Sequence, residues 1–263
     1  MLAGRLDAIG RYPDARRATA VLAEVLGVER DRVVLTNGGA EAIALVAAEC
    51  PTGRVEHPEF SLYERHLGAL DPAGPRWRSN PSSPLGALAD AADTAAVWDE
   101  AYYQLATGRW TRGDDDAWRV GSLTKLWACP GLRVGYVIAP DASAARRIAR
   151  RQPRWSLNAL AVVAIEALVP VAELSRWAVE IADRRRQLAD MVRSHGLTVT
   201  DTDAGWVLVR QPGLRADLVA HRVLVRDCAS FGLVGWHRIA VPDDRGFERL
   251  GHALARVTTE GRP

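Results

Sequence analysis

A single lysine, Lys125, stands out among the residues that could do chemistry in this chain. Of the 34 lysine and arginine side chains in the 263 residues, 33 are arginine. A guanidinium stays protonated in proteins, whereas a desolvated lysine amine can lose its proton and condense with an aldehyde to form a Schiff base. The alternative is an arginine-rich composition that spared one lysine by chance. The residues around Lys125 must decide between the two interpretations.

The neighbours of Lys125 favour a phosphate beside the amine. Ser122 and Thr124 precede it, and Arg133 follows eight residues later, just before the apolar run Val134 to Ala139. Hydroxyls donate single hydrogen bonds, and a guanidinium can form a bidentate, charge-assisted pair with a phosphate. These residues therefore predict a site that holds a phosphate dianion next to a reactive amine.

This stretch resembles the lysine motif of the fold-type I pyridoxal-phosphate enzymes of the class I/II aminotransferase family, which reads roughly [ST]-x-[ST]-K-x7-R-x-G. The resemblance implies that Lys125 carries pyridoxal 5'-phosphate as a Schiff base, while Ser122, Thr124 and Arg133 bind the cofactor phosphate. It also implies an α/β fold. We expect a large, mainly parallel-sheet domain over residues 12–165 and a smaller α+β C-terminal domain over residues 166–263, with residues 1–11 as a short lead-in.

Two stretches upstream extend the resemblance. Residues 33–35 read as a short buried strand, and a Gly-Gly turn then leads into a helix. Glycines let a phosphate approach the unpaired amides at a helix start, and the resemblance assigns Gly39 and Ala40 as those donors. Without the lysine motif the glycines would indicate only a turn. Phe60 resembles the aromatic that stacks on the pyridine ring, since stacking needs only a π face; a core aromatic is the alternative.

Asp99 is the second candidate catalytic residue. The apolar run Thr94 to Trp98 predicts a buried strand, and a carboxylate at its carboxyl end lies where α/β sheets bind ligands. A carboxylate paired with the pyridine nitrogen keeps it protonated and makes the ring an electron sink. The resemblance gives Tyr102 a hydrogen bond to the phenolic oxygen of the cofactor. Ser83 replaces the family's asparagine at that oxygen, so we expect that contact to be lost or water-mediated.

The C-terminal half supplies the candidate substrate ligands. The resemblance places Arg238 at the substrate α-carboxylate and Arg226 at a substrate phosphate, since guanidinium forks match both anions. In so arginine-rich a chain, a surface ion pair is the alternative for either residue. Asn158 is expected to border the site. We expect no metal.

Tyr12 is expected to serve a neighbouring subunit. It precedes a proline, which favours an extended backbone. The resemblance implies that Tyr12 reaches the cofactor phosphate of the partner subunit in a homodimer. The chain begins almost at this element, so we also expect it to lack the N-terminal arm with which relatives cover the substrate.

Composition argues against several classes of protein. A net charge of +2 with interspersed acids and bases gives no clustered positive charge for nucleic acid. No apolar run approaches the length of a membrane span, and the N-terminus lacks the apolar region of a signal peptide. Three cysteines, an odd number without metal-ligand spacing, favour a reducing compartment, the cytoplasm.

The run from residue 226 to 232, with residues 153–158, most resembles the L-threonine-O-3-phosphate decarboxylases of cobalamin biosynthesis. Histidinol-phosphate aminotransferases are the alternative, because both chemistries use the same lysine, aspartate and arginines. A third interpretation is a homologue that binds the cofactor with little turnover. The two enzyme interpretations predict a small phosphorylated amino acid or amine as substrate.

Overall fold

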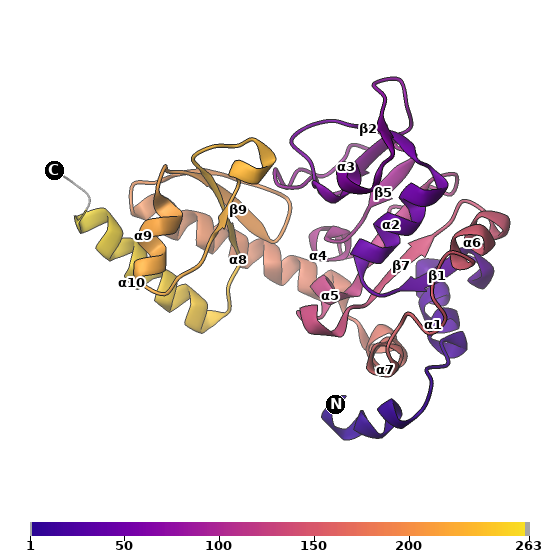
Figure 1. Cartoon of the computed structure of the whole chain (residues 1–263). Coiled ribbons are helices and arrows are strands. Elements are labelled where there is room, and N and C mark those ends of the chain that lie inside the picture. The colour runs from indigo at the N-terminus through magenta and orange to yellow at the C-terminus, as the bar shows by residue number, and fades with distance from the viewer. Residues whose placement is uncertain (1, 261–263) are drawn as a thin grey trace.

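Two β-sheets organise the chain, which a computed structural model describes from residue 2 to residue 260. Helix α8 (Leu174–Ser194) runs between them (Figure 1). Strands of the larger sheet are β1 (Val33–Thr36), β2 (Thr52–Val55), β3 (Ala69–Leu70), β4 (Arg76–Ser79), β5 (Val97–Asp99), β6 (Trp118–Ser122) and β7 (Gly135–Ile138). The helices near it are α1 (Arg16–Leu26), α2 (Gly39–Glu49), α3 (Leu62–His66), α4 (Tyr103–Thr107), α5 (Leu123–Leu126), α6 (Ala142–Ala149) and α7 (Ala159–Leu168). No helix within the described range is long and apolar enough to cross a membrane.

The larger sheet is mainly parallel, as predicted. Its strand order is β1-β7-β6-β5-β4-β2-β3, and only β7 runs antiparallel to its neighbours in the described part of the chain. Ser79, the last residue of β4, pairs with Asp99, the last residue of β5. Since β6 is parallel to β5, the carboxyl ends of three strands meet at one edge, where α/β sheets bind ligands.

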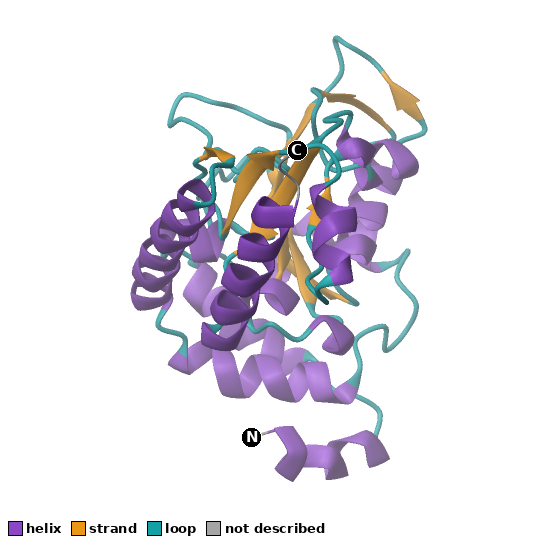
Figure 2. Cartoon of the chain, turned by 90° about the vertical axis from the view of Figure 1, so that its left-hand side faces the viewer, coloured by secondary structure: helices purple, strands orange, loops and turns teal. Residues whose placement is uncertain are grey.

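Helices cover both faces of this sheet, because its strands alternate apolar side chains between two cores. Val33 and Leu35 pack in a cluster with residues of α1 and α7, whereas Val34 packs with residues of α2 and α6. Figure 2 shows helices on both sides of the strands. A sheet buried on both faces explains why β1 and β7 read as continuous apolar runs.

The smaller sheet is antiparallel, with the strand order β10-β11-β9-β8. Its strands are β8 (Thr198–Thr200), β9 (Trp206–Arg210), β10 (Arg226–Asp227) and β11 (Trp236–Ala240), and helices α9 (Leu214–Ala220) and α10 (Asp244–Glu260) accompany it. Val207, Val209 and Ile239 pack with these two helices and with α8 in one core. Alternation along the strands therefore turns Trp206 and Arg238 to the opposite face.

The predicted domain boundary between residues 165 and 166 falls inside α7, whose residues pack with α1. That boundary stays a prediction. Hydrogen bonds also tie the loop after β4 to the segment before β9. The Trp206 indole donates to the Pro84 carbonyl at 2.9 Å, Asp203 N donates to Gly86 O at 2.8 Å, and Leu88 N donates to Asp203 Oδ2 at 2.9 Å. These bonds hold the two sheets' loops against each other.

Candidate active site

The start of α2 forms one end of the site. The helix begins at Gly39, shortly after β1 ends at Thr36; Gly38 is its N-cap residue, and no side chain caps it. Its first amides, those of Gly39 and Ala40, therefore lack intrahelical partners and point out of the helix end. Gly135 of β7 lets this turn lie close, because a Cβ there would stand 2.5 Å from Gly38 C. The backbone thus presents N–H groups to an anion.

Two hydroxyls and a guanidinium lie beside these amides. Ser122, the last residue of β6, forms a 2.7 Å hydrogen bond between its Oγ and Thr124 Oγ1. A Cβ built on Gly39 would lie 3.6 Å from Ser122 Cβ, and one built on Gly38 would lie 2.3 Å from Arg133 Nη2. Arg133 has φ 55°, a left-handed backbone that side chains rarely adopt. Amides, hydroxyls and a guanidinium together fit a phosphate. We call these groups, from Gly39, Ala40, Ser122, Thr124 and Arg133, the phosphate cradle.

Lys125 directly follows Thr124 of the cradle and lines a cavity of about 310 Å³. It lies on the short helix α5, which follows β6 without a break. Its Nζ is 5.5 Å from the centroid of the Tyr102 ring. The cavity brings together seven of the predicted residues: Phe60, Ser83, Asp99, Tyr102, Lys125, Arg226 and Arg238.

Asp99 ends β5 and is 7% exposed. Its Oδ1 accepts a hydrogen bond from Ala101 N at 2.9 Å, and its Oδ2 accepts one from the Tyr63 hydroxyl at 2.8 Å. Burial raises the pKa of Asp99, while these two hydrogen bonds and the charge of Lys125 oppose the rise. Each carboxylate oxygen keeps a lone pair, so the group can still pair with a pyridinium N–H.

A second buried carboxylate, Glu59, fixes the loop that carries Ser83. Glu59 accepts hydrogen bonds from Ser79 N at 2.9 Å, from Phe60 N at 3.0 Å and from the Ser79 hydroxyl. Ser83 N in turn donates to Ser79 Oγ at 2.7 Å. Burial raises the pKa of Glu59. Sequence reasoning missed Glu59 and Ser79, because neither belongs to a motif with a recognisable spacing.

Two arginines of the smaller sheet enter the same cavity. Arg226 and Arg238 are direct partners across β10 and β11. Arg226 Nη2 donates to Ser230 Oγ at 2.9 Å, and Arg238 Cζ lies 4.7 Å from the centre of the Trp206 ring. Within residues 2–260, neither guanidinium forms an ion pair with a carboxylate. The described residues therefore do not support the alternative role of Arg226 or Arg238 in a surface ion pair.

Besides the five phosphate-binding residues Gly39, Ala40, Ser122, Thr124 and Arg133, two predicted residues lie outside the cavity. Asn158 caps α7, with Oδ1 accepting from Ala161 N at 2.9 Å and Nδ2 donating to Leu132 O at 2.8 Å. Tyr12 is 76% exposed and stacks on Trp155, with ring centroids 4.3 Å apart. The structure does not bring either residue to Lys125, and both roles stay predictions.

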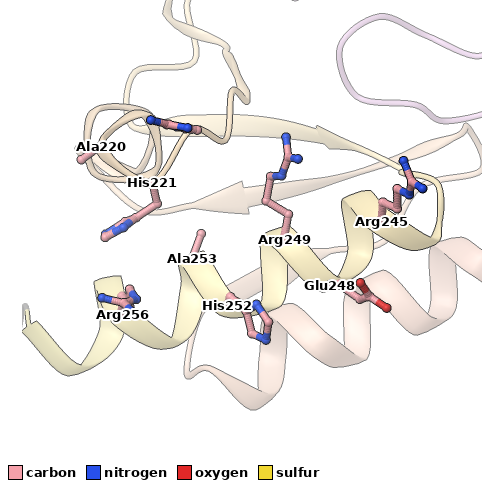
Figure 3. A pocket seen from close by; sticks show the side chains of 9 residues that line it. Ala220, His221, Arg245, Glu248, Arg249, His252, Ala253 and Arg256 are labelled. Atoms are coloured by element: carbon pink, nitrogen blue, oxygen red, sulfur yellow. The ribbon is translucent and has the colours of Figure 1, made fainter.

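A larger groove of about 600 Å³ lies elsewhere, along α10 and the end of α9. Figure 3 shows its labelled side chains, most of them basic: Arg245, Arg249, His252 and Arg256 come from α10, and His221 from the turn after α9. It lacks a reactive amine, and none of the predicted residues lines it. The smaller cavity is the candidate active site, because Lys125, the chain's one lysine, and Asp99 both line it.

Comparisons with known proteins identify the family of the chain. Residues 78–254 match the family model described as aminotransferase class I and II. The chain is 28% identical to a threonine-phosphate decarboxylase from Salmonella typhimurium, covering 98% of this chain and 86% of that relative. It is 30% identical to a histidinol-phosphate aminotransferase from Mycobacterium bovis, covering 86% and 73%. The structure of the histidinol-phosphate aminotransferase from Clostridium acetobutylicum has a TM-score of 0.87 at 22% identity, covering 97% and 92%.

The fold is the α/β fold of the fold-type I pyridoxal-phosphate enzymes, and the site fits that cofactor. An amine, a buried carboxylate with free lone pairs and an aromatic ring line one cavity, and the hydroxyls of the phosphate cradle flank the amine in sequence at the junction of β6 with α5. The chain belongs to the class I and II aminotransferase family, and it is a pyridoxal-phosphate-dependent enzyme.

Proposed function

We propose that this enzyme decarboxylates L-threonine O-3-phosphate to 1-aminopropan-2-ol phosphate. The observation that carries the proposal is the pair Arg226 and Arg238, whose guanidinium groups face the cavity of Lys125 without a carboxylate partner among the described residues. Threonine phosphate carries a carboxylate and a phosphate on one molecule, so it engages both forks at once. The similarity to the Salmonella decarboxylase over 98% of this chain supports the same substrate.

Each group in the cavity has a role in this proposal. Lys125 would hold the cofactor through its aldehyde; once the substrate amine has displaced it there, the freed Lys125 ammonium would supply the proton that replaces the departing carboxylate on the substrate α-carbon, with release of carbon dioxide. Asp99 would keep the pyridine nitrogen protonated, Phe60 would stack on the ring, and Tyr102 would donate to the phenolic oxygen. The bound cofactor supplies the electron sink for the α-carbon electron pair. The phosphate of the cofactor, as distinct from that of the substrate, would be held by Gly39, Ala40, Ser122, Thr124 and Arg133.

Histidinol-phosphate transamination is the second candidate. The 30% identical relative from Mycobacterium bovis favours it. Histidinol phosphate has a phosphate and no carboxylate, so that half-reaction leaves Arg238 without an anion, and only the dicarboxylate acceptor of the other half-reaction engages it. For threonine phosphate, rotation about the bond between the α-carbon and the amine nitrogen would decide whether the carboxylate or the hydrogen is positioned to leave, and so whether decarboxylation or transamination follows.

One assay separates these functions. Holoenzyme is incubated with threonine phosphate, and separately with histidinol phosphate plus 2-oxoglutarate, while carbon dioxide and glutamate are followed. Carbon dioxide from threonine phosphate supports the proposal. Glutamate without carbon dioxide replaces it with the aminotransferase. If neither carbon dioxide nor glutamate forms although the protein shows the absorption band of bound cofactor, the protein is a homologue that binds the cofactor with little turnover.

The same proposal includes a homodimer that works in cobalamin biosynthesis in the cytoplasm. The exposed stack of Tyr12 on Trp155, outside the cavity, supports a role for Tyr12 at a neighbouring subunit. The three cysteines are free thiols, in keeping with a reducing compartment. Sedimentation equilibrium tests the dimer, and weaker cofactor binding in Tyr12→Phe tests the contact. A monomer that binds the cofactor fully would contradict both.

A further inference from the structure

Trp206 joins three parts of the site without lining the cavity. It opens β9 and is 2% exposed. The centre of its ring lies 4.7 Å from Arg238 Cζ and 4.8 Å from the centroid of the Tyr102 ring, which meets it edge-on at 75°. Its indole N–H donates to the Pro84 carbonyl at 2.9 Å. Arg238, Tyr102 and the loop of Ser83 therefore share one neighbour.

The sheet register places this indole beneath the guanidinium. Trp206 pairs with Ala240, and Arg238 pairs with Leu208, so Trp206 and Arg238 are diagonal neighbours on one face. Long side chains meet at that separation. Two contacts restrict the indole: the Tyr102 ring packs against it, and the Pro84 carbonyl accepts its N–H.

Arg238 needs such a support. Within residues 2–260 its guanidinium forms no hydrogen bond or ion pair, so stacking on Trp206 is the described contact that restricts it. An arginine side chain has many rotamers, and a group held in its binding orientation loses less freedom when the ligand arrives.

We propose that Trp206 is a positioning residue for substrate recognition: it holds the Arg238 guanidinium where that group meets the substrate carboxylate. This inference rests on the proposed function, which gives Arg238 that carboxylate. Trp206 contributes nothing to a ligand without a carboxylate.

Two ligands test the inference in the holoenzyme. Threonine phosphate carries the carboxylate, and 1-aminopropan-2-ol phosphate lacks it but keeps the amine and the phosphate. The KM for threonine phosphate comes from initial rates of carbon dioxide release, and the Kd of the amine from its perturbation of the cofactor absorption band at equilibrium. If no carbon dioxide appears, the same titration gives a Kd for threonine phosphate.

Trp206→Leu removes the ring, and we expect about a tenfold rise in the KM for threonine phosphate, with the Kd of the amine within about twofold of wild type. Trp206→Phe keeps a ring under the guanidinium and loses the bond to Pro84, so a smaller rise is expected; it also guards against misfolding of the leucine variant. In Arg238→Ala the Trp206→Leu change should add nothing, because its effect passes through Arg238.

Trp236→Leu is the matched control, since Trp236 lies on the same sheet, 6.0 Å from Arg210 Cζ, and outside the cavity. It should change neither ligand. Equal weakening of both ligands in Trp206→Leu and Trp206→Phe would overturn the inference as a general structural effect, and so would unchanged binding of both. If Arg238→Ala itself fails to weaken threonine phosphate selectively, the proposed role of Arg238 fails instead, independently of Trp206.

Discussion

Replacing Gly38 by alanine should damage the phosphate cradle through Arg133. Gly38 has φ 81° and ψ 170°, a conformation that is essentially restricted to glycine. A Cβ there would stand 2.3 Å from Arg133 Nη2 and 2.8 Å from Cζ. The guanidinium is the end of a flexible side chain, so it moves away while the backbone stays.

The two consequences have different sizes. The backbone strain costs about 1–3 kcal/mol of unfolding free energy. Displacing the guanidinium removes charge-assisted hydrogen bonds to the cofactor phosphate, at about 1.5–3 kcal/mol each. At about 1.4 kcal/mol per factor of ten, we expect pyridoxal phosphate to bind about 10- to 100-fold more weakly.

Gly27→Ala is the control for backbone strain. Gly27 ends α1 with φ 66°, and nothing lies within 4 Å of the Cβ position. This variant should lose about 1 kcal/mol of stability and keep its cofactor affinity. Urea unfolding measures the first quantity, and titration of the cofactor absorption band measures the second. Wild-type affinity in Gly38→Ala, or an equal loss of affinity in Gly27→Ala, would refute the reasoning.

Three other predictions follow. Borohydride reduction of the holoenzyme and peptide mapping should place the label on Lys125, and a label elsewhere would contradict its role. Asp99→Ala should keep the cofactor bound and lower kcat about 100-fold or more, whereas Arg133→Ala should chiefly weaken cofactor binding; equal binding losses would count against separate roles. Burial raises the pKa of Glu100 from 4.5 to about 7, so the folded state holds more protons than the unfolded state between these values. The unfolding free energy should therefore fall by up to about 3 kcal/mol as the pH rises through that range. Glu100→Gln should lose this dependence in urea unfolding at pH 5 and pH 8, and an unchanged slope would argue against Glu100 as its source.

The cofactor side of the site was predictable because its parts are local in sequence. Ser122, Thr124 and Lys125 sit at the junction of β6 with α5, and Gly39 sits where β1 turns into α2. A strand, a turn and a helix start need only a short window of sequence to specify them. Asp99 followed from one further rule, that parallel strands end at a common edge.

The support of the site was not predictable, because it depends on strand register. Nothing local indicates that Trp206 lies diagonal to Arg238, since that follows from the pairing of β9 with β11. The same cause places β10 at Arg226–Asp227 and not at the more apolar residues 223–225, because Arg226 and Asp227 are the residues that pair with β11. Leu224 is 73% exposed instead.

The pairing of β10 with β11 also bears on the proposed substrate, which carries two anionic groups. It puts Arg226 directly opposite Arg238, and like charges at directly opposite positions destabilise a sheet. Since no carboxylate pairs with either guanidinium among the described residues, the repulsion persists in the free protein. A ligand with one anionic group can neutralise only one of the two guanidinium groups, whereas a ligand with a carboxylate and a phosphate can neutralise both. If the proposed function holds, we therefore expect threonine phosphate to bind more tightly than an amine that carries a phosphate alone.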